Sequence, residues 1–279
     1  MTDYSFEIFP PKEEAELDKT YGVLDRLDSL KPSLISVTYG AGGSSSKKTL
    51  ELVKYIKKSL RADALAHMTC VGYKKETLKE MLTELENIGC KRILALRGDR
   101  PKWMSDEEFE GMEFSHASDM IAYIKEHSSL EIAAACYPEK HPAAASAEED
   151  LTHLKEKVEA GATLLITQMF FDNDIFYRFL EQLEKRDIHA KVDAGIMPIT
   201  SSKQLGTSVT LSGSSIPKAL SDLIARYGED PEDMRKAGID FAARQIQDLI
   251  DHGADGVHIY SMNRARSMED LIHEIFPGN

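Results

Sequence analysis

The chain has 279 residues, with 34 Lys and Arg against 47 Asp and Glu, which gives a formal net charge of −13 at pH 7. Hydrophobic residues make up 42% of the chain, enough at this length to bury a substantial core, so a disordered protein is excluded. The acidic balance argues against nucleic acid as the main partner, because a phosphate backbone needs a basic surface.

Cysteine use and the N-terminus indicate the compartment. Cys70, Cys90 and Cys136 lie far apart and form no CxxC pair, which argues against a disulfide framework and a zinc site. The first residues lack the pattern of a signal peptide, and no apolar run approaches the roughly 20 residues of a transmembrane helix. We therefore expect a cytoplasmic protein with no bound metal and no membrane contact.

Eight short apolar segments alternate with helical patterns, and we predict that they are strands. They begin at residues 5, 33, 64, 92, 131, 164, 191 and 256, so most starts are 27 to 39 residues apart. Strands that alternate with helices at this spacing are typical of a (β/α)8 TIM barrel of roughly 250 residues. The predicted strands are 5–10, 33–40, 64–70, 92–99, 131–138, 164–172, 191–200 and 256–263.

The long interval before the last strand leaves room for an extra helix, since residues 217–227 and 231–251 both have helical patterns. No segment has the composition of a linker. We therefore predict a single α/β domain over residues 1–279, a (β/α)8 TIM barrel with an extra helix before the last strand. An open doubly wound sheet is the alternative, because it uses the same alternation.

Three segments are predicted to be loops. Residues 43–46 and 207–215 are short and rich in serine, as surface loops often are. Residues 100–114, with Trp103 and several acidic residues, are predicted to form a longer loop between a strand and a helix.

Polar residues gather at the carboxyl ends of the predicted strands, where the catalytic groups of a TIM barrel lie. One such residue alone says little, but the pattern extends over at least six strands. The residues are Glu7, Thr38, Tyr39, His67, Thr69, Arg97, Gly98, Asp99, Tyr137, Glu139, Lys140, His141, Gln168, Tyr260, Asn263 and Arg264.

Glu7 lies between Phe6 and Ile8 in the first predicted strand. Desolvation there would favour the neutral form of its carboxyl group, and a protonated carboxyl near neutral pH can act as a general acid. The alternative is an ion pair inside the barrel with a residue such as Arg97 or Lys157. The pattern leaves both interpretations open.

Arg97, Gly98 and Asp99 end the fourth predicted strand and offer a cation, an uncovered backbone and an anion. Arginine suits phosphate or planar polar groups, and glycine lets a flat ring approach the main chain. The alternative is a turn with a local salt bridge. The glycine-rich residues 40–44 do not complete a dinucleotide-binding fingerprint, because Ser45 stands where the third glycine would fall.

A predicted helix over residues 146–160 carries Asp150, His153 and Lys157 at helical spacing, along the border of its apolar face. Such a position suits groups that hold a nucleotide cofactor. An ordinary helix boundary would show the same pattern, so both interpretations stay open.

Six motifs in chain order resemble those of the bacterial methylenetetrahydrofolate reductase family. The resemblance implies a (β/α)8 barrel with non-covalent FAD, which NADH or, less often, NADPH reduces before 5,10-methylenetetrahydrofolate accepts the hydride and becomes 5-methyltetrahydrofolate. It also implies a homo-oligomer that serves one-carbon metabolism and methionine biosynthesis. The motifs are Phe-Glu-Ile-Phe-Pro-Pro (6–11), Val-Thr-Tyr-Gly-Ala-Gly (37–42), Leu-Arg-Gly-Asp (96–99), Tyr-Pro-Glu-Lys-His-Pro (137–142), Thr-Gln-Met-Phe-Phe-Asp (167–172) and Tyr-Ser-Met-Asn-Arg-Ala (260–265).

The resemblance also implies roles for individual residues. Glu7 matches the general acid that helps protonate N10 of the folate, and Asp99 matches a carboxylate that stabilises the resulting cation and tunes the flavin. The substrate-binding positions are Asp99, Gln168, Gln204, Tyr260 and Arg264, with Arg264 facing the folate's glutamate. The FAD-binding positions are Thr38, Tyr39, Ala41, His67, Arg97, Gly98, Asp99, Ala117, Tyr137, His141, Ala144, Asp150, His153 and Lys157.

The sequence departs from the enterobacterial pattern at three positions. His153 stands where that pattern has Asn, and Glu156 stands where it has Arg. Ser208 falls near the position at which that pattern has an aromatic residue that helps to stack the nicotinamide cofactor. These departures leave the electron donor open. The alternative function is a non-catalytic or complex-dependent flavin- or folate-binding subunit that uses another donor. A barrel aldolase would need a Schiff-base lysine at a strand end, and no predicted strand ends with one.

Overall fold

The structure, a computed structural model, describes residues 3–39 and 45–277. Its strands are β1 (Asp3–Ile8), β2 (Leu34–Val37), β3 (Asp63–Thr69), β4 (Arg92–Leu96), β5 (Glu131–Cys136), β6 (Leu164–Thr167), β7 (Lys191–Ile196) and β8 (Gly256–Tyr260). Neighbours in this order pair in parallel, and β8 pairs with β1 to close the barrel. This confirms the predicted TIM barrel and excludes the open sheet, whose first and last strands would not pair.

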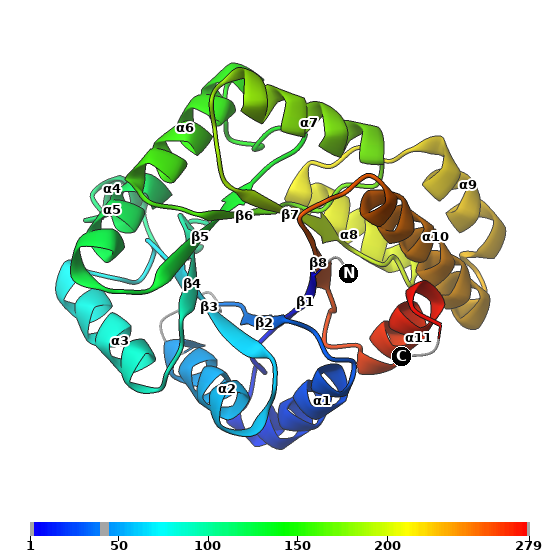
Figure 1. The fold of residues 1–279 in the computed structure, drawn as a ribbon, viewed down its shortest axis with the longest axis horizontal. Helices are drawn as coiled ribbons and strands as arrows, with labels where there is room; N and C mark the ends of the chain where they lie inside the picture. The colour runs from blue at the N-terminus through cyan, green and yellow to red at the C-terminus, as the bar shows by residue number, and fades with distance from the viewer. Residues whose placement is uncertain (1–2, 40–44, 278–279) are drawn as a thin grey trace.

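The helices surround the barrel (Figure 1). They are the 3-10 helix η1 (Glu14–Glu16), α1 (Leu17–Ser29), α2 (Ser45–Ser59), α3 (Lys75–Asn87), α4 (Asp106–Glu110), α5 (Ala117–His127), α6 (Ala147–Ala160), α7 (Asn173–Lys185), α8 (Ser202–Ser212), α9 (Lys218–Tyr227), α10 (Pro231–Asp251) and α11 (Ala265–Ile275). Within residues 3–39 and 45–277, none of the helices combines the length and the apolar character needed to cross a membrane.

The strands end one to five residues earlier than predicted, although β4 to β8 begin at the predicted residue. The reason is that the apolar runs continue into loops that bury their side chains without pairing in the sheet. Met169 and Phe171 follow β6, Met197 and Ile199 follow β7, and all four join one buried cluster above these strands. Hydrophobic pattern therefore located the strands but overestimated their length.

Two predicted loops contain helices. In residues 207–215, α8 extends to Ser212, because Leu205 at its start packs into the cluster with Met197 and Ile199. In residues 100–114, Ser105 is the N-cap of α4, and its hydroxyl accepts a hydrogen bond from Glu108 N at 3.2 Å. Of residues 43–46, the first two lie outside the described residues and the others begin α2.

The interval before β8 holds the two predicted helices, which are α9 and α10, and a third helix, α8, that was not predicted (Figure 1). The longest of them, α10, packs closely on the segment after β7. A Cβ atom built on Gly238 would lie 1.9 Å from the carbonyl oxygen of Ile199, so only glycine allows this approach. The contact fixes the loop that leads from β7 into α8.

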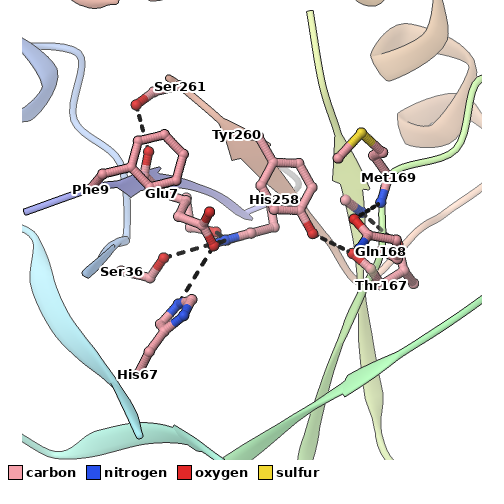
Figure 2. Close-up of polar contacts among 12 residues, drawn as sticks. Glu7, Phe9, Ser36, His67, Thr167, Gln168, Met169, His258, Tyr260 and Ser261 are labelled. Atoms are coloured by element: carbon pink, nitrogen blue, oxygen red, sulfur yellow. Dashed lines mark hydrogen bonds and ion pairs between the residues drawn. The ribbon is translucent and has the colours of Figure 1, made fainter. Parts of the chain in front are cut away.

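The inward-facing side chains of the barrel form an apolar layer and a polar group. Strands β2 to β6 contribute an apolar layer of Leu34, Leu65, Leu94, Ala133 and Ile166. The buried polar side chains come from β1, β2, β3 and β8 and are Ser5, Glu7, Ser36, His67 and His258. Figure 2 shows four of them, Glu7, Ser36, His67 and His258. Parallel barrels usually fill this space with branched apolar residues, so the polar group marks the region where chemistry is expected.

Alanine substitutions at two helical glycines should have opposite effects on stability. A Cβ atom added to Gly22 in α1 would meet no neighbouring part of the protein within 4 Å, so Gly22→Ala should stabilise the protein by roughly 1 kcal/mol through helix propensity. Gly238→Ala should destabilise it by about 2 kcal/mol or more, because α10 must move away from Ile199. Chemical unfolding of the two variants checks this. Equal stabilisation by both would contradict the packing described for α10.

Acid should destabilise the fold through His67. Burial lowers the pKa of His67 to about 4, although Glu7 opposes part of this shift. The histidine of the unfolded chain takes up a proton near pH 6.5, whereas the buried ring does so only near pH 4. The free energy of unfolding should therefore fall by about 2 kcal/mol through this residue as the pH falls from 7 to 5. Unfolding free energies at both pH values should therefore fall more for the native protein than for His67→Gln. The same fall in both proteins would show that His67 is not held neutral.

Candidate active site

Glu7 lies on the floor of the site, inside the barrel near the carboxyl ends of the strands. Its Oε2 is 3.5 Å from His67 Nε2 on β3 and 3.7 Å from His258 Nε2 on β8 (Figure 2). The cations considered as partners lie elsewhere: the Arg97 guanidinium covers the Phe109 ring at 4.7 Å, and Lys157 Nζ donates to Ala135 O at 2.7 Å. The buried carboxyl group therefore has two imidazole neighbours in place of an Arg or Lys partner.

A tight turn after β8 fixes the backbone on which Glu7 sits. Ser261 donates to the carbonyl of Glu7 through its hydroxyl and, at 3.3 Å, through its backbone N–H. Asn263 accepts from Phe9 N and donates to Phe9 O, both at 2.9 Å. Met262 and Asn263 have φ of 52° and 55°, the left-handed conformation that asparagine tolerates well. These contacts tie the end of β1 to the β8–α11 turn.

Tyr260 reaches across the barrel wall from β8 to β6. Its hydroxyl donates to Thr167 O at 2.7 Å, and burial raises its pKa, so the phenol is neutral at physiological pH. Gly195 on the intervening β7 makes room, because a Cβ atom there would lie 3.0 Å from the Tyr260 hydroxyl and 2.1 Å from Thr167 O. Gln168 follows Thr167, and its Oε1 accepts from Met169 N at 2.9 Å (Figure 2).

The loop after β4 presents Arg97 and Asp99 on the rim, where both are exposed. Gly98 has a φ of 80°, and a Cβ atom there would lie 3.0 Å from Thr69 Cβ, so this position requires glycine. No ion pair joins Arg97 to Asp99 in the described part of the chain, so the alternative of a local salt bridge is wrong.

The loop after β5 and helix α6 form a second polar cluster. Asp150 Oδ2 accepts from His141 N at 3.0 Å, and the Tyr137 and His141 rings lie 4.5 Å apart. Burial raises the pKa of Tyr137 to about 12. Burial also lowers the pKa of Lys157, because desolvation disfavours its charged ammonium form. Asp150 and Lys157, two of the three residues that the sequence placed along the border of α6, thus face this cluster, whereas His153 does not.

His153 and Glu156, two of the departures from the family pattern, contact each other. His153 Nδ1 lies 3.1 Å from Glu156 Oε2, and both side chains are exposed. The His116 ring stacks on His153 at 5.8 Å, next to Ala117 at the start of α5. The exposed side of α6 therefore carries an imidazole and a carboxylate, next to the imidazole of His116 at the start of α5.

The rim at β7 and β8 brings together two predicted substrate-binding residues that are far apart in the chain. Arg264 Nη1 lies 3.3 Å from Gln204 Oε1 and also donates to the hydroxyl of Thr200. Gln204 Oε1 in turn accepts from Thr200 N at 3.2 Å. Arg264 remains exposed, so its guanidinium is held in place but open to solvent.

The remaining predicted residues lie around the β2 and β5 ends. Thr38 N donates to Ile8 O at 3.0 Å, the Tyr39 ring lies 5.5 Å from that of Tyr73, and Ala144 N donates to His141 O at 3.0 Å. Ala41 lies outside the described residues. Ser208 belongs to α8, but its side chain is not among those described.

Sequence reasoning missed His258, Ser261 and the role of Asn263. His258 lies two residues before Tyr260, so it shares the inward face of β8 with it, and the period of two in a strand was the available signal. The turn residues gave no such signal, because their contacts with Glu7 and Phe9 bridge about 254 positions of the sequence.

Known proteins resemble this chain over most of its length. The sequence profile of the methylenetetrahydrofolate reductase family matches residues 1–276. The chain is 34% identical to the 5,10-methylenetetrahydrofolate reductase of Pectobacterium carotovorum subsp. carotovorum over 97% of this chain and 89% of that protein. It is 32% identical to methylenetetrahydrofolate reductase (NADH) 1 of Arabidopsis thaliana over 96% of this chain and 47% of that protein.

Among solved structures, an uncharacterized protein from Clostridium thermocellum that binds two copies of 5-methyl-5,6,7,8-tetrahydrofolic acid has a similar fold. The TM-score is 0.70 at 14% identity, over 98% of this chain and 94% of that one, and this likeness concerns the fold alone. The profile match and the identity to full-length bacterial enzymes carry the assignment: the chain belongs to the methylenetetrahydrofolate reductase family.

Proposed function

We propose that the chain is a flavoenzyme that reduces 5,10-methylenetetrahydrofolate to 5-methyltetrahydrofolate in a ping-pong reaction, with NADH or NADPH as the electron donor. The observation that carries this proposal is the carboxyl group of Glu7, buried inside the barrel between two histidines in a chain of this family. A buried carboxyl that can hold a proton is the group such a reduction needs at its substrate nitrogen.

The residues present fit FAD. His67 Nε2 is buried and has no hydrogen-bond partner among the described residues, so it is available to a polar ligand edge. Arg97 and Lys157 supply cations for phosphates, and Asp150 supplies an acceptor for ribose hydroxyls. We propose that the cofactor is held by Thr38, Tyr39, Ala41, His67, Arg97, Gly98, Asp99, Ala117, Tyr137, His141, Ala144, Asp150, His153 and Lys157. When bound, FAD would take a hydride from the nicotinamide donor and pass it to the folate.

Glu7 and Asp99 would divide the proton and charge chemistry between them. Glu7 is buried inside the barrel beside the imidazoles of His67 and His258, and we propose that its carboxyl group is the acid that gives a proton to N10 of the folate. Asp99 is exposed on the rim and would place a negative charge beside the cation that forms.

The substrate-binding residues would be Asp99, Gln168, Gln204, Tyr260 and Arg264. Arg264 is exposed at the mouth and oriented by Thr200 and Gln204, so its guanidinium suits the carboxylate of the folate's glutamate. Tyr260 and Gln168 are fixed by backbone contacts beside the floor, where the ring system of the folate would lie.

The electron donor and the setting of the enzyme belong to the same proposal. The His153–Glu156 pair removes one phosphate-binding arginine from the family pattern, and we propose that His153 takes over as the polar contact. The three buried thiols of Cys70, Cys90 and Cys136 suit a reducing cytoplasm. A homo-oligomer that serves one-carbon metabolism and methionine biosynthesis follows from the family.

The Glu7→Gln variant tests the acid. Flavin reduction by NADH should stay near the rate of the native protein, because no proton from Glu7 is needed there. Folate reduction should fall by at least about 10²-fold, the size of a general-acid contribution. Stopped-flow measurement of the two half-reactions separates these effects, and Glu159→Gln on the exposed side of α6 is the matched control. Normal folate turnover by Glu7→Gln would reject the assignment.

A further inference from the structure

The segment between α8 and α9 contacts two other loops at the carboxyl ends of the strands. Residues 213–215, here called the strap, follow α8, which itself follows β7. Ser214 Oγ donates to Met169 O at 2.6 Å, in the loop after β6. Ser215 N donates to Glu139 Oε1 at 2.9 Å, in the loop after β5. The strap therefore connects the loops after three consecutive strands, β5, β6 and β7.

Gly213 turns the chain from α8 toward the β5 loop. It follows the last residue of α8 and has a φ of 71°, the left-handed conformation with which many helices end. A Cβ atom there would lie 3.2 Å from Pro142 Cγ, so the strap packs directly on the β5 loop. One hydrogen bond and one close packing contact thus join the strap to residues 139–142, and the two segments depend on each other for their positions.

The elements that the strap connects carry residues proposed for different ligands. The β5 loop holds Tyr137, His141 and Ala144, which we propose for FAD. The first turn of α8 holds Gln204, whose Oε1 lies 3.3 Å from Arg264 Nη1, and we propose both residues for the folate. Helix α8 has 11 residues and is about 16 Å long, and a rigid helix carries a displacement from one end to the other.

Glu139 is the polar link between the two sides. Its half-buried carboxylate accepts from Ser215 N, and within residues 3–39 and 45–277 it forms no ion pair. A hydrogen bond from a backbone N–H to a carboxylate is stronger than one between neutral groups. Without this carboxylate, the Pro142 contact alone would join the strap to the β5 loop.

We propose that Glu139 is a positioning residue that couples the two sides of the site: through its hydrogen bond to Ser215, FAD bound at the β5 loop keeps α8 in the position that binds the folate. This inference rests on the proposed function, which supplies both ligands. A residue that only braced the fold would contribute to stability, but it would not transmit cofactor binding to the strap.

Hydrogen exchange measured by mass spectrometry tests the coupling without turnover. In the native protein, loading with FAD should slow exchange in the peptide that covers residues 212–217 by roughly tenfold, a usual size for coupling between two sites. In Glu139→Ala, FAD should still protect residues 137–144 but no longer the strap. Glu159→Ala on the exposed side of α6 is the matched control and should behave as the native protein does. Equal protection of the strap by FAD in Glu139→Ala would overturn the proposal.

Stopped-flow measurement of the folate half-reaction gives a second readout. Glu139→Ala should raise the apparent Kd of the reduced enzyme for 5,10-methylenetetrahydrofolate about tenfold and leave the limiting rate within about twofold, because Glu139 does not touch the reacting atoms. Glu139→Gln keeps an acceptor oxygen and should bring this Kd to within about threefold of the native value. An unchanged Kd in Glu139→Ala, or a fall in the limiting rate alone, would overturn the proposal.

The outcomes distinguish this proposal from the proposed function. A protein that takes up no FAD would reject the proposed function and the coupling with it. FAD that binds and is reduced by NADH, but leaves exchange in the native strap unchanged, would reject the coupling alone. Should Glu139→Ala fail to fold, Ser215→Pro removes the N–H donor from the exposed side of the same hydrogen bond and should have the same effects.

Discussion

The carboxyl group of Glu7 lies inside a parallel barrel, and a buried carboxyl is costly unless polar groups surround it. The polar neighbours of Glu7 Oε2 are imidazoles from β3 and β8, whose Nε2 atoms lie 3.5 Å (His67) and 3.7 Å (His258) away. Ser5 and Ser36 then satisfy His258, and the Ser261–Asn263 turn holds the backbone of Glu7 and Phe9. Residues of β1, β2 and β8 therefore surround Glu7 and hold its backbone in place.

Apolar side chains fill another part of the barrel interior. Leu34, Leu65, Leu94, Ala133 and Ile166 form one buried cluster contributed by β2 to β6. The charged residues that we propose for the cofactor lie at the carboxyl ends of β3 to β5, and Gln204 and Arg264, which we propose for the substrate, lie at those of β7 and β8. Gly195 has no side chain, which leaves room for Tyr260 to reach Thr167 across β7. Gly238 allows α10 to pack directly on Ile199 in the β7–α8 loop.

The sequence was enough to predict the barrel, because strand spacing depends on local hydrophobic pattern, and β4 to β8 begin at the predicted residues. The sequence also predicted that Glu7 is buried within its strand, and it named Gln204 and Arg264, which the structure brings within 3.3 Å of each other. The ends of the strands could not be predicted, since Met169 and Ile199 are buried in loops and look like strand residues. Nor could the partners of Glu7, because His258 and Asn263 approach it through pairings that depend on closure of the barrel.

The visible absorbance spectrum of the purified protein, before and after anaerobic addition of NADH and then of 5,10-methylenetetrahydrofolate, tests the central claim most directly. We expect a flavin spectrum that bleaches with NADH and returns with the folate. A flavin spectrum that NADH and NADPH both leave oxidised would support FAD as the cofactor but require another electron donor or a partner protein. A colourless protein that also fails to take up added FAD would contradict the proposed function.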